Sequence, residues 1–122
     1  HGPIEPRRAP LLLDLLTTLF YVGIKSNMGA ECIARDRFPL DDNSFVDLVI
    51  WRVPQPVRGC THQYKYRLAY IDHDLCVIRF DNEAGKGDHK HIGAKEFPFE
   101  FSSIAQLYDE FYKEVDLWRM TR

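Results

Sequence analysis

The segment from Asp81 to His91 holds the highest concentration of reactive side chains in this sequence of 122 residues. Its residues, D-N-E-A-G-K-G-D-H-K-H, include two histidines, two lysines and three carboxylates. Gly85 and Gly87 can adopt positive φ angles and expose backbone N–H groups, and Lys86 lies between them, so the segment is able to hold a phosphate. The spacing is not that of a Walker A motif, and alone it is more typical of a solvated turn.

His89 and His91 are two residues apart, so in an extended segment their side chains lie on one side and that of Lys90 on the other. Histidine titrates near pH ~6.5, so such a pair can supply the base and the acid of a proton transfer. With Asp81 or Asp88 the same pair can instead bind a divalent metal. No third ligand stands at a diagnostic spacing, so we expect no metal or other cofactor. Two surface histidines bonded to a turn are the remaining interpretation.

These residue types suit the cleavage of RNA without a metal. The reaction needs a base for the ribose 2′-OH, a cation for the phosphate and an acid for the leaving 5′-oxygen. We therefore expect the catalytic residues to be His89 as the base, His91 as the acid, Lys86 as the cation, and Asp88. Cations in neighbouring segments are expected to bind RNA phosphates, and these are Lys90, Lys65, Arg67, Arg79 and Arg52. A solvated sheet face is the competing interpretation of the cations.

Four extended segments precede and position this polar segment. Alternating apolar residues predict a hairpin of Ala30–Phe38 with Phe45–Val53, and a second pair of strands over Gln63–Ile71 and Leu75–Phe80. Short polar turns join the members of each pair, so we expect four consecutive antiparallel strands. The stretch Asp81–Lys95 is too polar for a core strand and is predicted to be a loop.

The third strand has two different faces. Residues two apart share a face, so Tyr64, Tyr66 and Tyr70 lie together, opposite Lys65 and Arg67. We expect the tyrosines to be part of the core and the cationic face to be the wetter one.

Two helices are predicted, one near each end of the chain. Ser103 and Gln106 form a capping box, and the apolar stripe from Ile104 to Trp118 predicts a C-terminal helix. A leucine-rich stripe over Leu11–Val22 predicts a short N-terminal helix. The fold class is therefore α+β: an antiparallel four-stranded sheet packed by the C-terminal helix, with an additional N-terminal helix.

The composition is that of one globular domain without a strong charge. Sixteen Lys and Arg against eighteen Asp and Glu give a net charge of -2, so any polyanion must be met by a local patch. The longest apolar stretch, Ala9–Ile24, contains Asp14 and is too short to span a bilayer, so we expect no membrane contact. Three cysteines without a C-x-x-C motif predict buried apolar filler in a reducing cytoplasm, and no disulfide framework.

The sequence also resembles a known family. Three runs carry the resemblance: F-V-D-L-V-I-W-R-V-P from Phe45, Y-K-Y-R-L-A-Y from Tyr64, and the segment from Asp81, whose D-N-x-x-G-K-G-D-H-[RK]-H pattern is the most specific. From about Met28 to Trp118 the chain is similar to the TumE family, toxins of bacterial and archaeal type II toxin–antitoxin modules. Because the residues before Met28 depart from that pattern, we expect residues 1–27 to be an extension carrying the short helix and residues 28–122 to be a single toxin domain.

The resemblance implies a small cytoplasmic toxin that is neutralised by a helix-turn-helix antitoxin encoded beside it. It implies no catalytic residues. Our leading expectation is growth inhibition by a metal-independent endoribonuclease, with RNA as substrate, by analogy with the many small toxins of such modules that cleave RNA. The alternatives are a metal-dependent nuclease, a toxin that transfers a phosphate or nucleotide, and a non-enzymatic module that binds nucleic acid or the antitoxin. The oligomeric state is open, and a homo-oligomer is among the alternatives.

Overall fold

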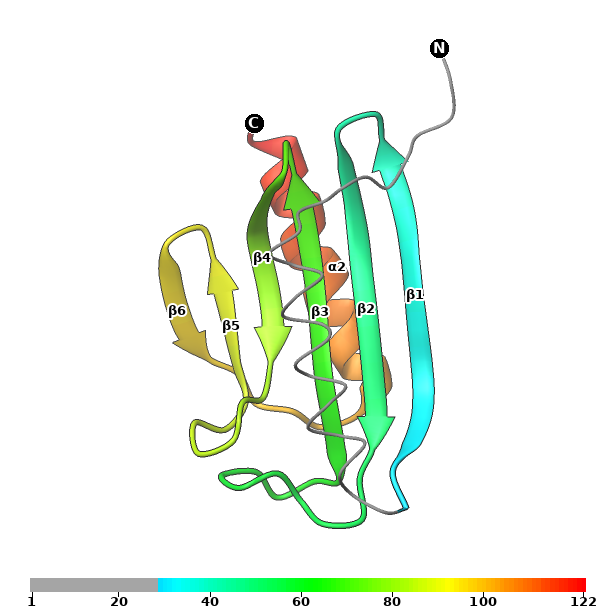
Figure 1. Cartoon of the computed structure of the whole chain (residues 1–122). Helices are drawn as coiled ribbons and strands as arrows, with labels where there is room; N and C mark the ends of the chain where they lie inside the picture. Colours follow the sequence, from blue (N-terminus) through cyan, green and yellow to red (C-terminus); the bar gives the residue numbers. More distant parts are fainter. Residues whose placement is uncertain (1–28) are drawn as a thin grey trace.

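The computed structural model describes residues 29–122, which form a six-stranded antiparallel sheet with one helix across one face (Figure 1). The strands follow one another across the sheet in chain order, from β1 at one edge to β6 at the other. The elements are β1 (Glu31–Asp41), β2 (Ser44–Arg52), β3 (Tyr64–Asp72), β4 (Leu75–Asp81), β5 (His89–Ile92), β6 (Lys95–Pro98) and α2 (Ile104–Met120). This confirms the α+β class and the packing of the C-terminal helix on an antiparallel sheet.

The first four strands agree with the sequence prediction, with ends shifted by no more than a few residues. In the turn between β1 and β2, the backbone N–H of Asn43 donates to Asp41 Oδ1 at 2.8 Å. Between β3 and β4, His73 and Asp74 have φ angles of 51° and 67°. Two successive positive φ angles fit a two-residue turn between twisted antiparallel strands.

The segment after β4 was predicted to be a loop, and the prediction of a four-stranded sheet is wrong because β5 forms within this segment and β6 follows it. Asp81 pairs with His89 and Arg79 with His91 across β4 and β5. Gly93, with a φ of 61°, turns the chain into β6. The backbone groups of β5 bond to the edge of β4, and this pairing tolerates polar side chains on a sheet face that α2 does not cover.

The main hydrophobic core lies between α2 and the sheet face that it covers. Tyr66 and Tyr70 are 0% and 1% exposed, which confirms that these tyrosines of β3 belong to the core. Arg67, on the other face, is only 6% exposed, so the predicted wetter face is wrong for this residue. The remaining buried members of the core are Val46, Leu48, Ile50, Leu68, Ile78, Phe80, Leu107, Phe111 and Val115.

The start of α2 confirms the predicted cap. The N–H of Gln106 donates to Ser103 Oγ at 3.0 Å, which satisfies one of the backbone donors that a helix start leaves unpaired. The side chain of Gln106 bonds backward to the segment that enters the helix, accepting from the N–H of Ser102 at 3.1 Å. The cap therefore fixes where the chain turns from β6 into α2.

The predicted helix over Leu11–Val22 and the proposed division after residue 27 fall in a part of the chain that lies outside the described residues. In the described part, no helix has the length and hydrophobicity of a transmembrane segment. The three cysteines are free, as expected, but Cys32 and Cys76 are exposed, so the prediction that they are buried filler is wrong.

Candidate functional site

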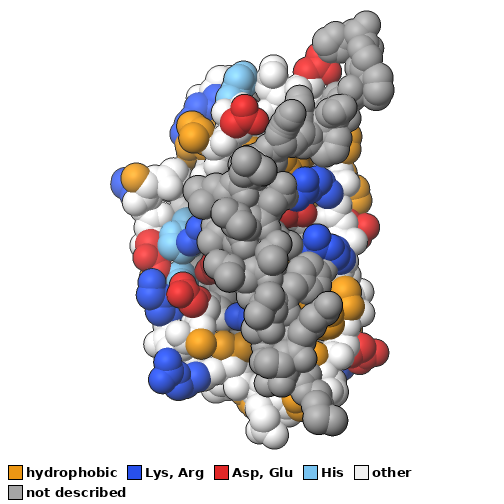
Figure 2. All heavy atoms as spheres, in the orientation of Figure 1, with side chains coloured by type: hydrophobic (Ala, Val, Ile, Leu, Met, Phe, Trp, Pro, Cys, Tyr) orange, Lys and Arg blue, Asp and Glu red, His pale blue; other side chains and the backbone are white. Residues whose placement is uncertain are grey.

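A polar cluster lies where β4, β5 and β6 run side by side. The strand register places Arg79 opposite His91, Asp81 opposite His89, and His91 opposite Glu96. Side chains alternate along a strand, so these five share the sheet face that α2 does not cover. Figure 2 views this face and shows histidine, basic and acidic side chains gathered beside one another. We call Arg79, Asp81, His89, His91 and Glu96 the polar cluster.

His89 is the buried centre of the polar cluster, with 4% of the residue exposed. Its Nδ1 lies 2.9 Å from the carbonyl oxygen of Gly87, and because a carbonyl only accepts, Nδ1 carries a proton. Its Nε2 lies 3.2 Å from Glu96 Oε2 and 3.7 Å from Asp81 Oδ1. The lone pairs of His89 Nε2, Glu96 Oε2 and Asp81 Oδ1 therefore face one another. Either a proton on Nε2 or a metal ion between the three atoms would relieve their repulsion.

His91 lies beside His89, with ring centroids 5.3 Å apart, and contacts Arg79. Arg79 Nη2 lies 3.0 Å from His91 Nε2. A guanidinium only donates, so Nε2 accepts and the neutral ring carries its proton on Nδ1. Burial and then the charge of Arg79 lower the pKa of His91 below its usual value. His91 is thus a neutral imidazole at pH 7, with 24% of its side chain exposed.

Asp81 lies between His89 and Arg79. Its Oδ2 forms an ion pair with Arg79 Nε at 3.0 Å. Its Oδ1 is buried and has no hydrogen-bond partner among the described residues, although it faces Nε2 of His89. Ligand atoms of Asp81, His89 and His91 all lie within 4.8 Å of one another, a spacing that a metal ion could bridge.

Asp88, predicted to be catalytic, lies outside the polar cluster. Its Oδ1 accepts from the hydroxyl of Tyr66 at 2.7 Å and lies 2.8 Å from Nε2 of His62. Nδ1 of His62 accepts from the backbone N–H of Tyr64 at 3.2 Å, so the proton of the neutral ring is on Nε2 and points at Asp88. Burial, followed by the bond to Asp88, raises the pKa of Tyr66. Asp88 therefore anchors the chain just before β5.

The loop that carries Lys86 is held against the segment between β2 and β3. The N–H of Gly85 donates to the carbonyl of Arg58 at 2.7 Å. Gly59 packs so closely on this loop that a Cβ there would lie 3.1 Å from the nitrogen of Gly87. Gly87 itself has a φ of 76°, so both glycines are needed for this close approach. Lys86 is exposed at the tip of the turn and is not brought into the polar cluster.

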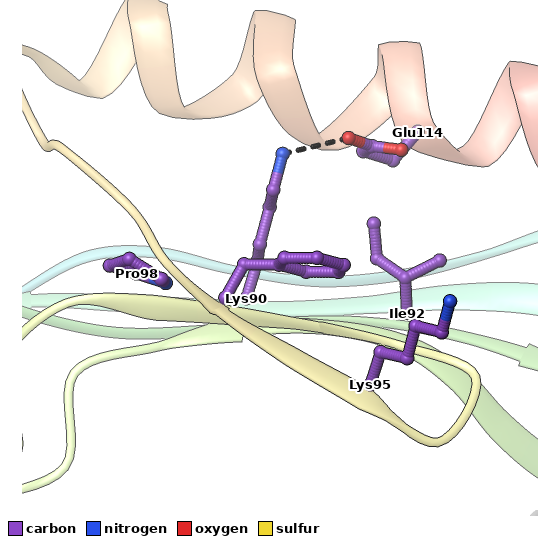
Figure 3. Close-up of a pocket in the computed structure, with 6 residues that line it drawn as sticks. Lys90, Ile92, Lys95, Pro98 and Glu114 are labelled. Atoms are coloured by element: carbon purple, nitrogen blue, oxygen red, sulfur yellow. Dashed lines mark hydrogen bonds and ion pairs between the residues drawn. The ribbon is translucent and has the colours of Figure 1, made fainter.

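Lys90 points to the opposite face, as the alternation predicted. Its Nζ lies 2.8 Å from Glu114 Oε2 of α2. Figure 3 marks this ion pair between the strand and the helix with a dashed line. This pair lines a pocket of about 540 Å³ between the β5–β6 hairpin and the helix. Phe97 and Lys95 line the same pocket. Lys90 thus ties the hairpin to α2 and does not reach the polar cluster.

The remaining predicted phosphate-binding cations are spread over the sheet. Arg67 pairs in register with Asp81, next to the polar cluster, and burial lowers its pKa. Burial also lowers the pKa of Lys65, against the opposing charges of Asp81 and Glu83. Arg52 lies farther along β2, 3.6 Å from Glu31 and over the ring of Tyr64.

The structure therefore brings together Arg79, His89 and His91 of the predicted site residues. Sequence reasoning missed Glu96 and His62. The signal for Glu96 was a third hairpin, which turns at Gly93 and which the loop prediction did not include. No local signal pointed to His62, which meets Asp88 across 26 residues of sequence.

The profile of a family described as toxin TumE matches residues 26–119. This match spans most of the chain. The chain belongs to the toxin TumE family. A toxin of this kind implies an antitoxin as partner, and all five residues of the polar cluster lie within the matched range. No curated protein and no solved structure matches the chain.

Proposed function

We propose that this TumE toxin inhibits growth as a metal-independent endoribonuclease whose active site is the polar cluster. The observation that supports this most strongly is the bond between a neutral histidine, His91, and the guanidinium of Arg79 at 3.0 Å. A neutral imidazole is a competent base at pH 7, and a guanidinium binds a phosphate through paired N–H donors. Base and phosphate ligand are thus side by side on one sheet face.

The proposed reaction uses the 2′-OH of RNA as the nucleophile. His91 Nε2 takes the 2′-OH proton once Arg79 turns from His91 to the phosphate. The 2′-oxygen bonds to phosphorus and the bond from phosphorus to the 5′-oxygen breaks. The leaving oxygen receives the proton that His89 Nε2 and Glu96 Oε2 share, and it receives it through Glu96, the accessible member with 48% of its side chain exposed. The products are a 2′,3′-cyclic phosphate and a 5′-hydroxyl.

These roles differ from those that the sequence suggested. His91 becomes the base instead of the acid, because its Nε2 accepts from Arg79 and is therefore unprotonated. His89 is too buried to contact RNA directly and acts through Glu96. Arg79 replaces Lys86 and Lys90 as the cation on the phosphate, because neither lysine lies in the polar cluster.

The test is cleavage of single-stranded RNA by the purified full chain in excess chelator, with DNA of the same sequence as the control substrate. We expect RNA fragments with cyclic phosphate ends and intact DNA, because DNA lacks the nucleophile. His91→Ala should lower the rate by about 100-fold or more, the usual loss when a base is removed. His73→Ala removes a histidine in the exposed β3–β4 turn and should cleave like the original protein.

Two results would contradict the proposal. Intact RNA after incubation with folded, antitoxin-free protein would exclude cleavage under these conditions. Growth arrest that survives His91→Ala, with the fold retained, would favour a toxin that acts by binding.

A further inference from the structure

We propose that the polar cluster also binds one divalent transition-metal ion of the zinc class, with Asp81, His89, His91 and Glu96 as ligands. The binding itself is independent of the proposed ribonuclease activity. Its consequence rests on that activity: a metal ion on His89 and His91 would occupy the nitrogen atoms that transfer protons and would inhibit RNA cleavage.

The spacing of the ligand atoms supports this site. Zinc bonds to imidazole nitrogen and carboxylate oxygen are about 2.0–2.2 Å long, so ligand atoms around a tetrahedral ion are about 3.4 Å apart. His89 Nε2 lies 3.2 Å from Glu96 Oε2 and 3.7 Å from Asp81 Oδ1, and His91 Nε2 lies 3.9 Å from Glu96 Oε2. Asp81, His89 and His91 thus already offer ligand atoms within 4.8 Å of one another, and Glu96 lies within 3.9 Å of both histidines as the fourth ligand.

The orientation of His89 is fixed in the way that metal-binding histidines require. Its Nδ1–H is directed at the carbonyl of Gly87, 2.9 Å away, which leaves Nε2 as the ligand atom. Next to it, Asp81 Oδ1 is buried without a hydrogen-bond partner among residues 29–122. A buried carboxylate oxygen without a donor is costly, and a metal ion would satisfy it.

Arg79 is the group that competes with the metal ion. Its Nη2 donates to His91 Nε2 at 3.0 Å. Its Nε forms an ion pair with Oδ2 of Asp81, the oxygen atom that does not face His89. Arg79 has 29% of its side chain exposed, so its end can turn toward solvent. The two carboxylates in the cluster offset the two charges of the incoming ion, and Arg79 need only release His91.

A second group with ligand atoms within 4.8 Å, Cys60, His62 and Asp88, serves as an internal comparison. Both ring nitrogens of His62 are already hydrogen-bonded, Nε2 to Asp88 and Nδ1 to the N–H of Tyr64, so neither is available to a metal ion. Burial, followed by the charge of Asp88, raises the pKa of Cys60 and keeps it a thiol, which is a poor ligand. We therefore expect the metal ion at the polar cluster and not at this group.

The experiment measures Zn²⁺ binding to the purified full chain by competition with a chromophoric chelator, without RNA. We expect one site. Asp81→Asn and His91→Gln should each weaken binding by about 100-fold or more, since even the loss of an outer partner of a metal ligand costs about 10–100-fold. Circular dichroism verifies that each variant is folded. Cys60→Ser and His73→Ala should bind zinc like the original protein.

Co²⁺ gives a second measurement, because its absorption spectrum reports the ligands. A tetrahedral spectrum without a thiolate charge-transfer band supports the polar cluster, whereas a thiolate band that Cys60→Ser abolishes overturns the assignment. Absence of zinc binding by folded protein also overturns it. Inhibition of cleavage by bound zinc supports both proposals. Cleavage that requires the metal keeps the metal site but contradicts the metal-independent reaction.

Discussion

The anchor formed by Tyr66 and Asp88 should stabilise the protein without taking part in the chemistry, and Tyr66→Phe tests this. The substitution keeps the ring in a position that is 0% exposed and removes only the hydroxyl, which lies 2.7 Å from Asp88 Oδ1. A hydrogen bond to a charged group contributes about 1.5–3 kcal/mol. We expect the free energy of unfolding to fall by about 2 kcal/mol, with His62 still bonded to the carboxylate.

Asp88→Ala should cost more, because it leaves the buried Tyr66 hydroxyl and the partly buried His62 N–H without an acceptor. Each unsatisfied donor costs about 1–3 kcal/mol, so the total is about 2–6 kcal/mol. In this background Tyr66→Phe removes one of the stranded donors. The double variant should therefore be as stable as Asp88→Ala or more stable, although Tyr66→Phe alone is destabilising.

Urea unfolding of the four proteins, with unchanged slope, measures this cycle. Additive losses, or a loss below about 0.5 kcal/mol for Tyr66→Phe, would show that the bond does not hold the chain before β5. A folded Tyr66→Phe should keep the toxicity of the original protein at temperatures well below its unfolding midpoint. Lost toxicity in that folded variant would instead support the predicted catalytic role of Asp88 and add Tyr66 to it.

Substitutions at three further positions probe the elements around the polar cluster. Ser103→Ala should cost about 1 kcal/mol by urea unfolding, because it removes the acceptor that caps α2, and Ser103→Gly should cost less. Gly85→Ala should lower the free energy of unfolding by about 1 kcal/mol or more, because Gly85 has a φ of 87° and a Cβ would lie 2.9 Å from Arg58 Nη2. Lys90→Met should lower the free energy of unfolding by about 1 kcal/mol, because it leaves Glu114 unpaired. The folded variant should retain RNA cleavage, because Lys90 faces α2. Lost cleavage would contradict that placement.

The strands that the sequence predicted correctly are those in which apolar and polar residues alternate clearly, so that the buried face can be recognised from one strand alone. In β3, Tyr66 and Tyr70 alternate with residues of the other face, so the period of two is visible without knowing any partner. The segment of β5 carries the same alternation, with His89 and His91 opposite Lys90. We predicted a loop because the segment is polar. The strand is stabilised by backbone hydrogen bonds to β4, and the side-chain sequence does not reveal that pairing.

The contacts that position the site are of a kind that one sequence does not reveal. His62 and Asp88 meet across 26 residues, and Glu96 reaches His89 from the next strand. These contacts depend on register and loop docking. Residue types alone could therefore predict His89 and His91 as site residues. They could not show that Asp88 anchors the chain before β5 whereas Asp81 faces the histidines.

The geometry also explains why the most specific run of the chain combines such different residues. Asn82 bridges the backbone of β3, accepting from the N–H of Tyr66 at 3.0 Å and donating to the carbonyl of Tyr64 at 2.7 Å. Asp88 anchors the other end of the same loop. These two buried contacts fix the ends of β4 and β5 relative to each other, and so hold Asp81 opposite His89. Most of the run is therefore scaffold, and the chemistry that we propose requires only the few side chains that face away from α2.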